Sequence, residues 1–167
     1  RLFLGPHASR FSAAEQTQII TRKNDRYLAR IERMSPADLA PGARELLQDL
    51  RRLGIPAAVA SSSRNAVYVL ERLGIRPLLD AVVDGNDVPL SKPDPTVFLC
   101  AAERLGVHPR RCVVVEDAAS GVAAGLAAGM KVVGLGPPQR VGQAHLVLDS
   151  LAALEARRIL ALLPSDC

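Results

Sequence analysis

The sequence predicts an α/β fold, a doubly wound parallel sheet with helices on both faces, on the basis of two observations. Three segments close an amphipathic run with Gly and then Pro: RRLGIP at 51–56, ERLGIRP at 71–77 and ERLGVHP at 103–109. Such endings are typical of helix C-termini. Short runs that are apolar on both faces lie between these helices, as in a parallel sheet buried on both sides.

The first 35 residues differ from the rest, because no strand pattern follows their helix. Ser12 and Glu15 have the spacing of a capping box, and a helical apolar face runs on to about residue 33. This face contains Ile19, Ile20, Tyr27, Leu28 and Ile31. The Pro-rich stretch SPADLAPG at 35–42 follows. We therefore expect part of a helical cap domain at 1–34, a hinge at 35–41 and a sheet domain at 42–167.

The sheet domain is expected to alternate strands with helices. The predicted strands are the short apolar runs at 57–60, 81–83, 112–115, 131–135 and 145–148. The predicted helices lie at 41–53, 64–73, 95–105, 121–128 and 151–163. Gly54, Gly74 and Gly106 are expected to end three of them in the left-handed conformation. The repeated Leu-Gly endings reflect repeated strand–helix units rather than a solenoid.

Composition excludes several classes of protein. The chain has 167 residues, 49% hydrophobic and 23% charged, and its apolar stretches stay far short of the roughly 20 residues of a membrane span. No signal peptide is recognisable, so a cytoplasmic location is expected. Cys100, Cys112 and Cys167 lack the spacing of a zinc site or a disulfide framework. The 21 basic residues are spread along the chain and there are only five aromatic residues, so nucleic-acid binding is not expected. The net charge of +4 suits a small anionic substrate.

Polar residues follow three of the predicted strands, where ligands bind in open parallel sheets. The first group, Ser61 to Asn65, enters a helix and can cradle an anion, although Ser63 is also an ordinary helix cap. Lys92 lies in SKPDP, before the next helix, and is either functional or a solvated charge. Glu116 and Asp117 end a Val-rich strand as possible Mg²⁺ ligands, unless Asp117 caps the helix and Glu116 points to water. Together these groups describe Mg²⁺-assisted phosphoryl transfer.

The same motifs carry a family resemblance between about residues 22 and 136. They are RKNDRY at 22–27, SPADLAPG at 35–42, ASSSRN at 60–65, SKPDP at 91–95 and VEDAASG at 115–121. In this order they resemble the haloacid dehalogenase superfamily, and more narrowly its β-phosphoglucomutase branch. The resemblance implies a Rossmann-like core with a helical cap, and a cytoplasmic, Mg²⁺-dependent enzyme that interconverts β-glucose 1-phosphate and glucose 6-phosphate. The expected partner is a small sugar phosphate, with no nucleic acid or membrane, and the complete protein is expected to be monomeric.

The resemblance also implies a role for each motif residue. Ser61 would hydrogen-bond the transferring phosphoryl group, Lys92 would neutralise its charge, and Glu116 and Asp117 would bind Mg²⁺. A second phosphate would be bound by Ser63, Arg64 and Asn65, with Lys23 reaching in from the cap. The family usually has Lys at position 64, and Arg would bind phosphate there as a fork rather than as a point charge.

One departure from the family pattern concerns catalysis. Family members carry a DxD motif that supplies the phosphorylated nucleophile and the general acid/base, and the sequence contains no Asp-x-Asp. A chain of these residues alone is therefore expected to be inactive and to lack the central strand of its sheet. An incomplete record, a fragment paired with another polypeptide and a degenerate gene all stay open. The alternatives to a mutase are a sugar-phosphate or phosphoglycolate phosphatase and a non-catalytic anion-binding module.

Overall fold

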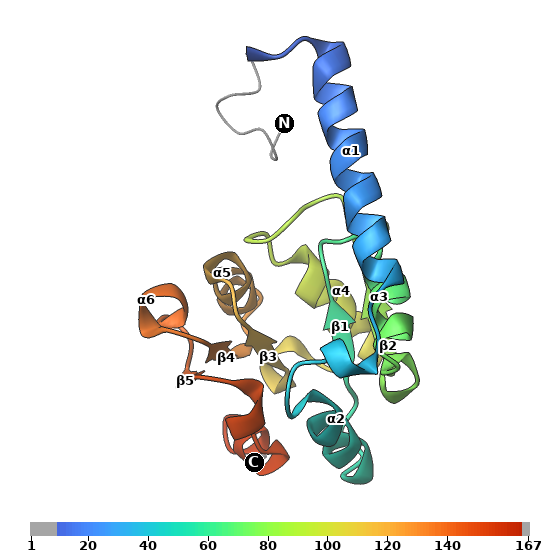
Figure 1. Cartoon of the computed structure of the whole chain (residues 1–167). Helices are drawn as coiled ribbons and strands as arrows, with labels where there is room; N and C mark the ends of the chain where they lie inside the picture. Colours follow the sequence, from blue (N-terminus) through green and yellow to red (C-terminus); the bar gives the residue numbers. More distant parts are fainter. Residues whose placement is uncertain (1–9, 165–167) are drawn as a thin grey trace.

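The computed structural model describes residues 10–164 and has the alternating order that the sequence predicts (Figure 1). The strands are β1 Ala58–Ala60, β2 Ala81–Val83, β3 Val113–Glu116, β4 Lys131–Leu135 and β5 Leu146–Leu148. The α-helices are α1 Ala13–Glu32, α2 Ala43–Arg52, α3 Ala66–Arg72, α4 Thr96–Leu105, α5 Ala119–Ala127, α6 Pro138–Val141 and α7 Ala156–Leu160. Short 3₁₀ turns are η2 Pro36–Asp38, η3 Arg76–Leu78, η4 Pro109–Arg111 and η5 Leu151–Ala153. Every predicted strand is present to within one residue.

The strands form two parallel sheets rather than one. In the described part of the chain, β1 pairs with β2, and β3, β4 and β5 form a second sheet in that order. Figure 1 shows β1 and β3 as the neighbouring edges of the two sheets. No strand between residues 10 and 164 pairs with both edges.

Helices cover both faces of each sheet, as a doubly wound fold requires. In β4, the adjacent residues Val132 and Val133 are each 0% exposed, and they belong to different clusters of buried residues. Val132 packs with α4 and α5, and Val133 packs with α2 and α7. In β2, Val83 lies in the same cluster as α4, whereas Val82 lies in a third cluster with α3. Successive side chains therefore point to opposite covered faces.

The ends of the helices follow the predicted capping. Ser12 accepts a hydrogen bond from the Glu15 amide, and the Glu15 carboxylate accepts one from Ser12, which completes the capping box of α1. Gly54, Gly74 and Gly106 have φ of +68°, +67° and +64°, as predicted. These left-handed glycines end three helices and turn the chain back toward the sheets.

The prediction of one continuous helix at 151–163 is wrong. This segment is divided into η5 and α7, and Leu154 between them is extended and only 5% exposed. A continuous helix would place Leu154 and Ile159 five positions, about 140°, apart around its axis. The break allows both side chains to enter the cluster beneath β4.

Helix α1 projects from the rest of the molecule (Figure 1). Its predicted apolar face is largely exposed, because Ile31 is its only buried residue and Ile20, Tyr27 and Leu28 are 38–39% exposed. The Arg72 guanidinium in α3 donates to the Glu32 carbonyl, 2.6 Å away, and so fixes the lower end of α1. The boundary between a cap at 1–34 and a core from residue 42 stays a prediction.

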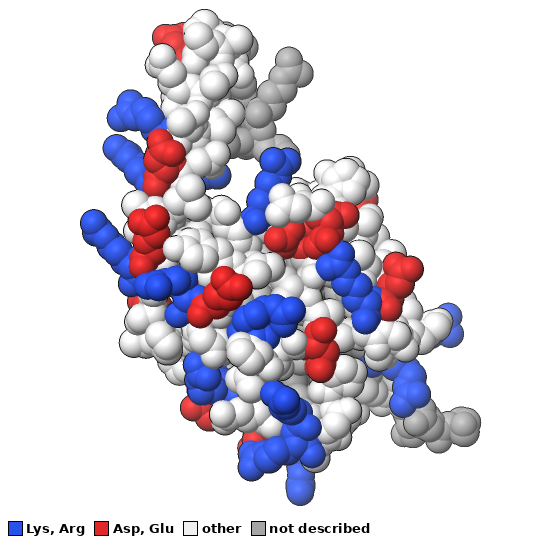
Figure 2. Space-filling view, turned by 90° about the vertical axis from the view of Figure 1, so that its right-hand side faces the viewer, with Lys and Arg blue, Asp and Glu red and all other residues white. Residues whose placement is uncertain are grey.

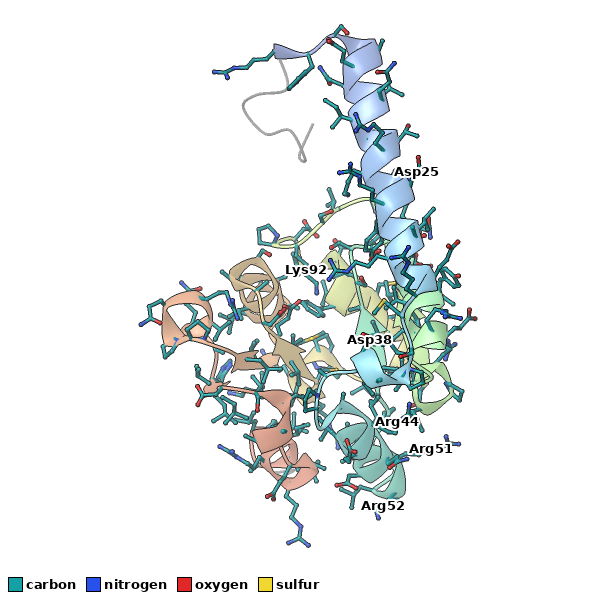
Figure 3. All side chains as sticks on the ribbon, viewed as in Figure 1. Asp25, Asp38, Arg44, Arg51, Arg52 and Lys92 are labelled. Atoms are coloured by element: carbon teal, nitrogen blue, oxygen red, sulfur yellow. The ribbon has the colours of Figure 1, made fainter. Side chains whose placement is uncertain are left out.

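Contacts between side chains and helix ends fix the remaining layers. Arg44 in α2 donates to the carbonyls of Leu73 and Gly74, both at 3.2 Å, and Arg51 donates to that of Pro77 (Figure 3).

None of the helices between residues 10 and 164 is long and apolar enough to cross a membrane. On the face shown in Figure 2, acidic and basic side chains are interspersed rather than gathered by sign.

Candidate active site at the carboxyl ends of the strands

The loop after β1, residues 61–65, folds its hydroxyl groups onto its own backbone. Ser61 Oγ accepts the Ser63 amide at 3.1 Å, and Ser63 Oγ accepts the Asn65 amide at 3.3 Å. The N-cap of α3 is Asn65, so Ser63 does not cap this helix as the simpler interpretation suggested. Ser61 and Ser63 are half-buried, whereas the Arg64 side chain is exposed. The loop thus presents hydroxyl, amide and guanidinium groups at one edge of the sheet.

Lys92 reaches both sheets. Its Nζ donates to the Ala60 carbonyl at 3.1 Å and forms an ion pair with Glu116 Oε1. The Ser61 amide donates to Val83 in β2, so the Ala60 carbonyl of the same peptide points to the opposite edge of β1. Lys92 therefore links the unpaired edge of β1 to the end of β3.

The surroundings of Lys92 exclude most water. Its side chain is 15% exposed and that of Glu116 is 11% exposed. The ammonium lies 4.5 Å from the centre of the Phe98 ring, a favourable cation–π arrangement. Lys92 lies between the ribbons of α4 and α5, on the side from which α1 projects (Figure 3). Asp25 and Asp38, by contrast, lie on α1 and η2 (Figure 3).

The two predicted metal ligands are in different environments. Glu116 Oε2 accepts the amides of Asp117 and Ala118 at 3.0 and 3.2 Å, while its Oε1 contacts Lys92. The carboxylate lies so close to Gly121 that a Cβ atom there would overlap it. Asp117 is exposed at the start of α5. Asp117 is thus open to solvent, whereas Glu116 pairs with Lys92 in this structure, and the binding of Mg²⁺ by both carboxylates stays a prediction.

The donor set therefore fits Mg²⁺ only in part. Among residues 10–164 no three or more His, Cys, Asp or Glu side chains converge as a metal site. Mg²⁺ is commonly held by one or two carboxylates, with water and substrate phosphate oxygens completing its shell. Asp117 can supply one such carboxylate.

Helix α1 contacts the 61–65 loop through Tyr27. The Tyr27 hydroxyl lies 3.4 Å from Ser63 Oγ. Lys23 is exposed one helical turn before Tyr27, so the two share a face of α1. Sequence analysis assigned Tyr27 only to an apolar face and missed this contact. The spacing of four residues from Lys23 was the signal that could have indicated it.

A second missed contribution comes from the turn after β2. Asn86 Nδ2 donates to the Arg64 carbonyl at 3.1 Å, and the Gly85 amide donates to the Ser63 carbonyl at 3.3 Å. The sequence shows a polar turn at 84–87, but not that it supports the neighbouring loop. The described structure thus brings together Ser61, Ser63, Lys92 and Glu116 at the carboxyl ends of the strands.

Comparisons with known proteins show relatives in sequence and in fold. Residues 5–129 match the family model for haloacid dehalogenase-like hydrolases. The chain is 40% identical over 153 residues to a β-phosphoglucomutase of Bacillus subtilis, covering 92% of this chain and 68% of that protein. It is also 40% identical over 115 residues to hexitol phosphatase A of Escherichia coli, covering 66% of this chain and 53% of that protein. The crystal structure of a β-phosphoglucomutase from Clostridium difficile superposes with a TM-score of 0.86 at 34% identity, covering 95% of this chain and 71% of that one.

Proposed function

Because the chain belongs to the haloacid dehalogenase-like hydrolases, we propose that its site binds a phosphorylated sugar and serves Mg²⁺-dependent phosphoryl transfer, in the first instance as a β-phosphoglucomutase. The observation that carries the proposal is the position of Lys92, which lies between the end of β1 and Glu116. A lone ammonium at the carboxyl ends of parallel strands is suited to a phosphoryl group.

Each side chain has a proposed task. An ammonium has three N–H donors, and within residues 10–164 the Ala60 carbonyl and Glu116 accept two of them. The third is assigned to an oxygen of the transferring phosphoryl group, together with the Ser61 hydroxyl. Glu116 holds the ammonium in place, while Ser63, Arg64 and Asn65 bind the second phosphate of a sugar bisphosphate. Lys23 and Tyr27 approach the sugar from α1.

Local charge explains why a metal ion is needed. Lys23, Lys92 and Arg64 carry three positive charges and Glu116 and Asp117 two negative ones, so the charged side chains assigned to the site have a net charge of only +1. A phosphate dianion therefore needs a further cation. Mg²⁺, held by Asp117, water and phosphate oxygens, would supply that charge and polarise the phosphoryl group. The nucleophile lies outside this assignment, because the sequence has no Asp-x-Asp.

The second candidate is a sugar-phosphate phosphatase, favoured by the equal 40% identity to the hexitol phosphatase. A mutase binds a second phosphate and excludes water from its site, whereas a phosphatase does neither. Water that reaches a phosphoryl-enzyme releases phosphate. Replacing Arg64 and Asn65 with Ala separates them. Measured on a protein that also carries the nucleophile, a mutase should lose isomerisation of β-glucose 1-phosphate more than it loses phosphate release, and equal loss of both would count against a mutase.

Binding is tested first. Glucose 6-phosphate is titrated calorimetrically into the full chain with Mg²⁺ and then with EDTA, using wild type, Arg64→Ala and Gln143→Ala as an exposed control. We expect Mg²⁺-dependent binding that weakens in Arg64→Ala and is unchanged in Gln143→Ala. The proposal is contradicted if the wild-type chain does not bind glucose 6-phosphate, or if Arg64→Ala leaves the affinity unchanged. Binding without turnover of any sugar phosphate, in a protein that also carries the nucleophile, favours the anion-binding module instead.

A further inference from the structure

We propose that Asn86 is a positioning residue, which holds the 61–65 loop in the conformation that binds phosphate. The inference rests on the proposed function of that loop. Asn86 lies in the turn Asp84–Asp87, directly after β2.

The turn and the loop are joined where strand pairing stops. The Ser61 amide donates to the Val83 carbonyl at 2.9 Å, which is the last backbone bond of the β1–β2 ladder. Beyond it, Gly85 N–H donates to the Ser63 carbonyl at 3.3 Å and Asn86 Nδ2 to the Arg64 carbonyl at 3.1 Å. The turn therefore continues the support of the loop after the strands have ended.

Gly85 allows the two segments to approach this closely. A Cβ atom at position 85 would lie 2.5 Å from the Ser62 carbonyl oxygen and 3.2 Å from the Arg64 amide nitrogen. Both neighbours are backbone atoms, so they cannot rotate aside as a side chain would. Any larger residue would displace the loop itself.

The Asn86 amide is in turn fixed by Asp84. The Asn86 backbone N–H donates to Asp84 Oδ1 at 2.8 Å, and its Nδ2 also lies 3.3 Å from Asp84 Oδ2. Asp84, at 7% exposed, is the one buried charged residue in the described part of the chain. Asp87 accepts the Asp84 amide at 2.8 Å and pairs with Arg104. A network anchored in α4 thus orients the Asn86 side chain toward the Arg64 carbonyl.

Glucose 6-phosphate in the presence of Mg²⁺ is the probe for testing this role by calorimetry on the full chain. Asn86→Ala removes the donor to Arg64, and we expect about tenfold weaker binding, as for the loss of one hydrogen bond. Asn86→Asp keeps the size of the side chain but places oxygen against the Arg64 carbonyl, and it should weaken binding at least as much. Gln143→Ala is the matched control, and thermal melting confirms that each variant folds.

A double-mutant cycle with Arg64→Ala tests whether Asn86 acts through the loop. We expect Asn86→Ala to weaken binding by less than about threefold once the Arg64 side chain is gone. Unchanged affinity in Asn86→Ala, or the same loss in both backgrounds, overturns the positioning role while the proposed function stands. Failure of the wild-type chain to bind glucose 6-phosphate overturns the proposed function, and this inference with it.

Discussion

Replacing Lys92 with Met tests the ion pair at the centre of the candidate site. The substitution keeps the length of the side chain but removes the charge that faces Glu116 and the donor to the Ala60 carbonyl. Removing one partner of a fully buried ion pair costs about 3–5 kcal/mol, and an unpaired buried carbonyl about 1–3 kcal/mol. Here the side chains are 15% and 11% exposed, and Glu116 keeps two backbone donors. We therefore expect the free energy of unfolding to fall by about 2–3 kcal/mol.

Urea unfolding at pH 7, followed by circular dichroism, measures this loss, provided that the slope of the transition is unchanged. Glu116→Gln in the Lys92→Met background removes the uncompensated charge, so about 1 kcal/mol should be recovered. The same variants should bind glucose 6-phosphate more weakly, since the ammonium is the proposed ligand of the phosphoryl group. A loss below about 0.5 kcal/mol, with no recovery in the double variant, would refute the ion pair as a contact that matters in solution.

Three further predictions concern packing, pH and thiol reactivity. Gly121→Ala places a methyl group against the Glu116 carboxylate and should lower the free energy of unfolding by about 1–3 kcal/mol, measured by urea denaturation. The hydrogen bond from Arg104 holds the pKa of Asp87 below its usual range, so this stabilisation is complete above the unfolded pKa of about 4 and is lost as the pH falls further. The urea midpoint should therefore fall more steeply below pH 4 in the wild type than in Asp87→Asn, and equal slopes would contradict this. Burial raises the pKa of the Cys112 thiol, so iodoacetamide at pH 8 should alkylate it more slowly than glutathione, as read by mass spectrometry.

Local sequence signals were sufficient to predict most of the helices and strands. The Gly-Pro endings located three helix C-termini, and β2 and β4 occupy the predicted ranges, because capping and apolar runs are properties of a few neighbouring residues. The helix at 151–163 failed because its break depends on how deeply Leu154 is buried beneath β4, which no local pattern contains. The helix α1 itself was predicted, but the exposure of its apolar face was not, since amphipathic spacing does not say what covers a face.

The site was predictable in its location but not in its pairings. The rule that ligands lie at the carboxyl ends of parallel strands placed Ser61, Lys92 and Glu116 at one edge. It could not show that Glu116 pairs with Lys92, because that ion pair joins residues 24 positions apart. The links from Tyr27 to Ser63, across 36 positions, and from Asn86 to Arg64, across 22, are equally invisible to a local pattern.

Because the proposed ligand would contact both sheets, its binding and the stability of the chain should depend on one another. Loop 61–65 follows a strand of one sheet and Asp117 a strand of the other, while Lys92 contacts both. A bisphosphate held by the loop and by a cation on Asp117 would therefore connect the same two edges that Lys92 connects. A ligand that binds only the folded state adds about 2.7 kcal/mol of stability at one hundred times its Kd. That is similar to the loss expected from Lys92→Met, so a saturating ligand should largely offset that substitution if the loop and Asp117 still bind it.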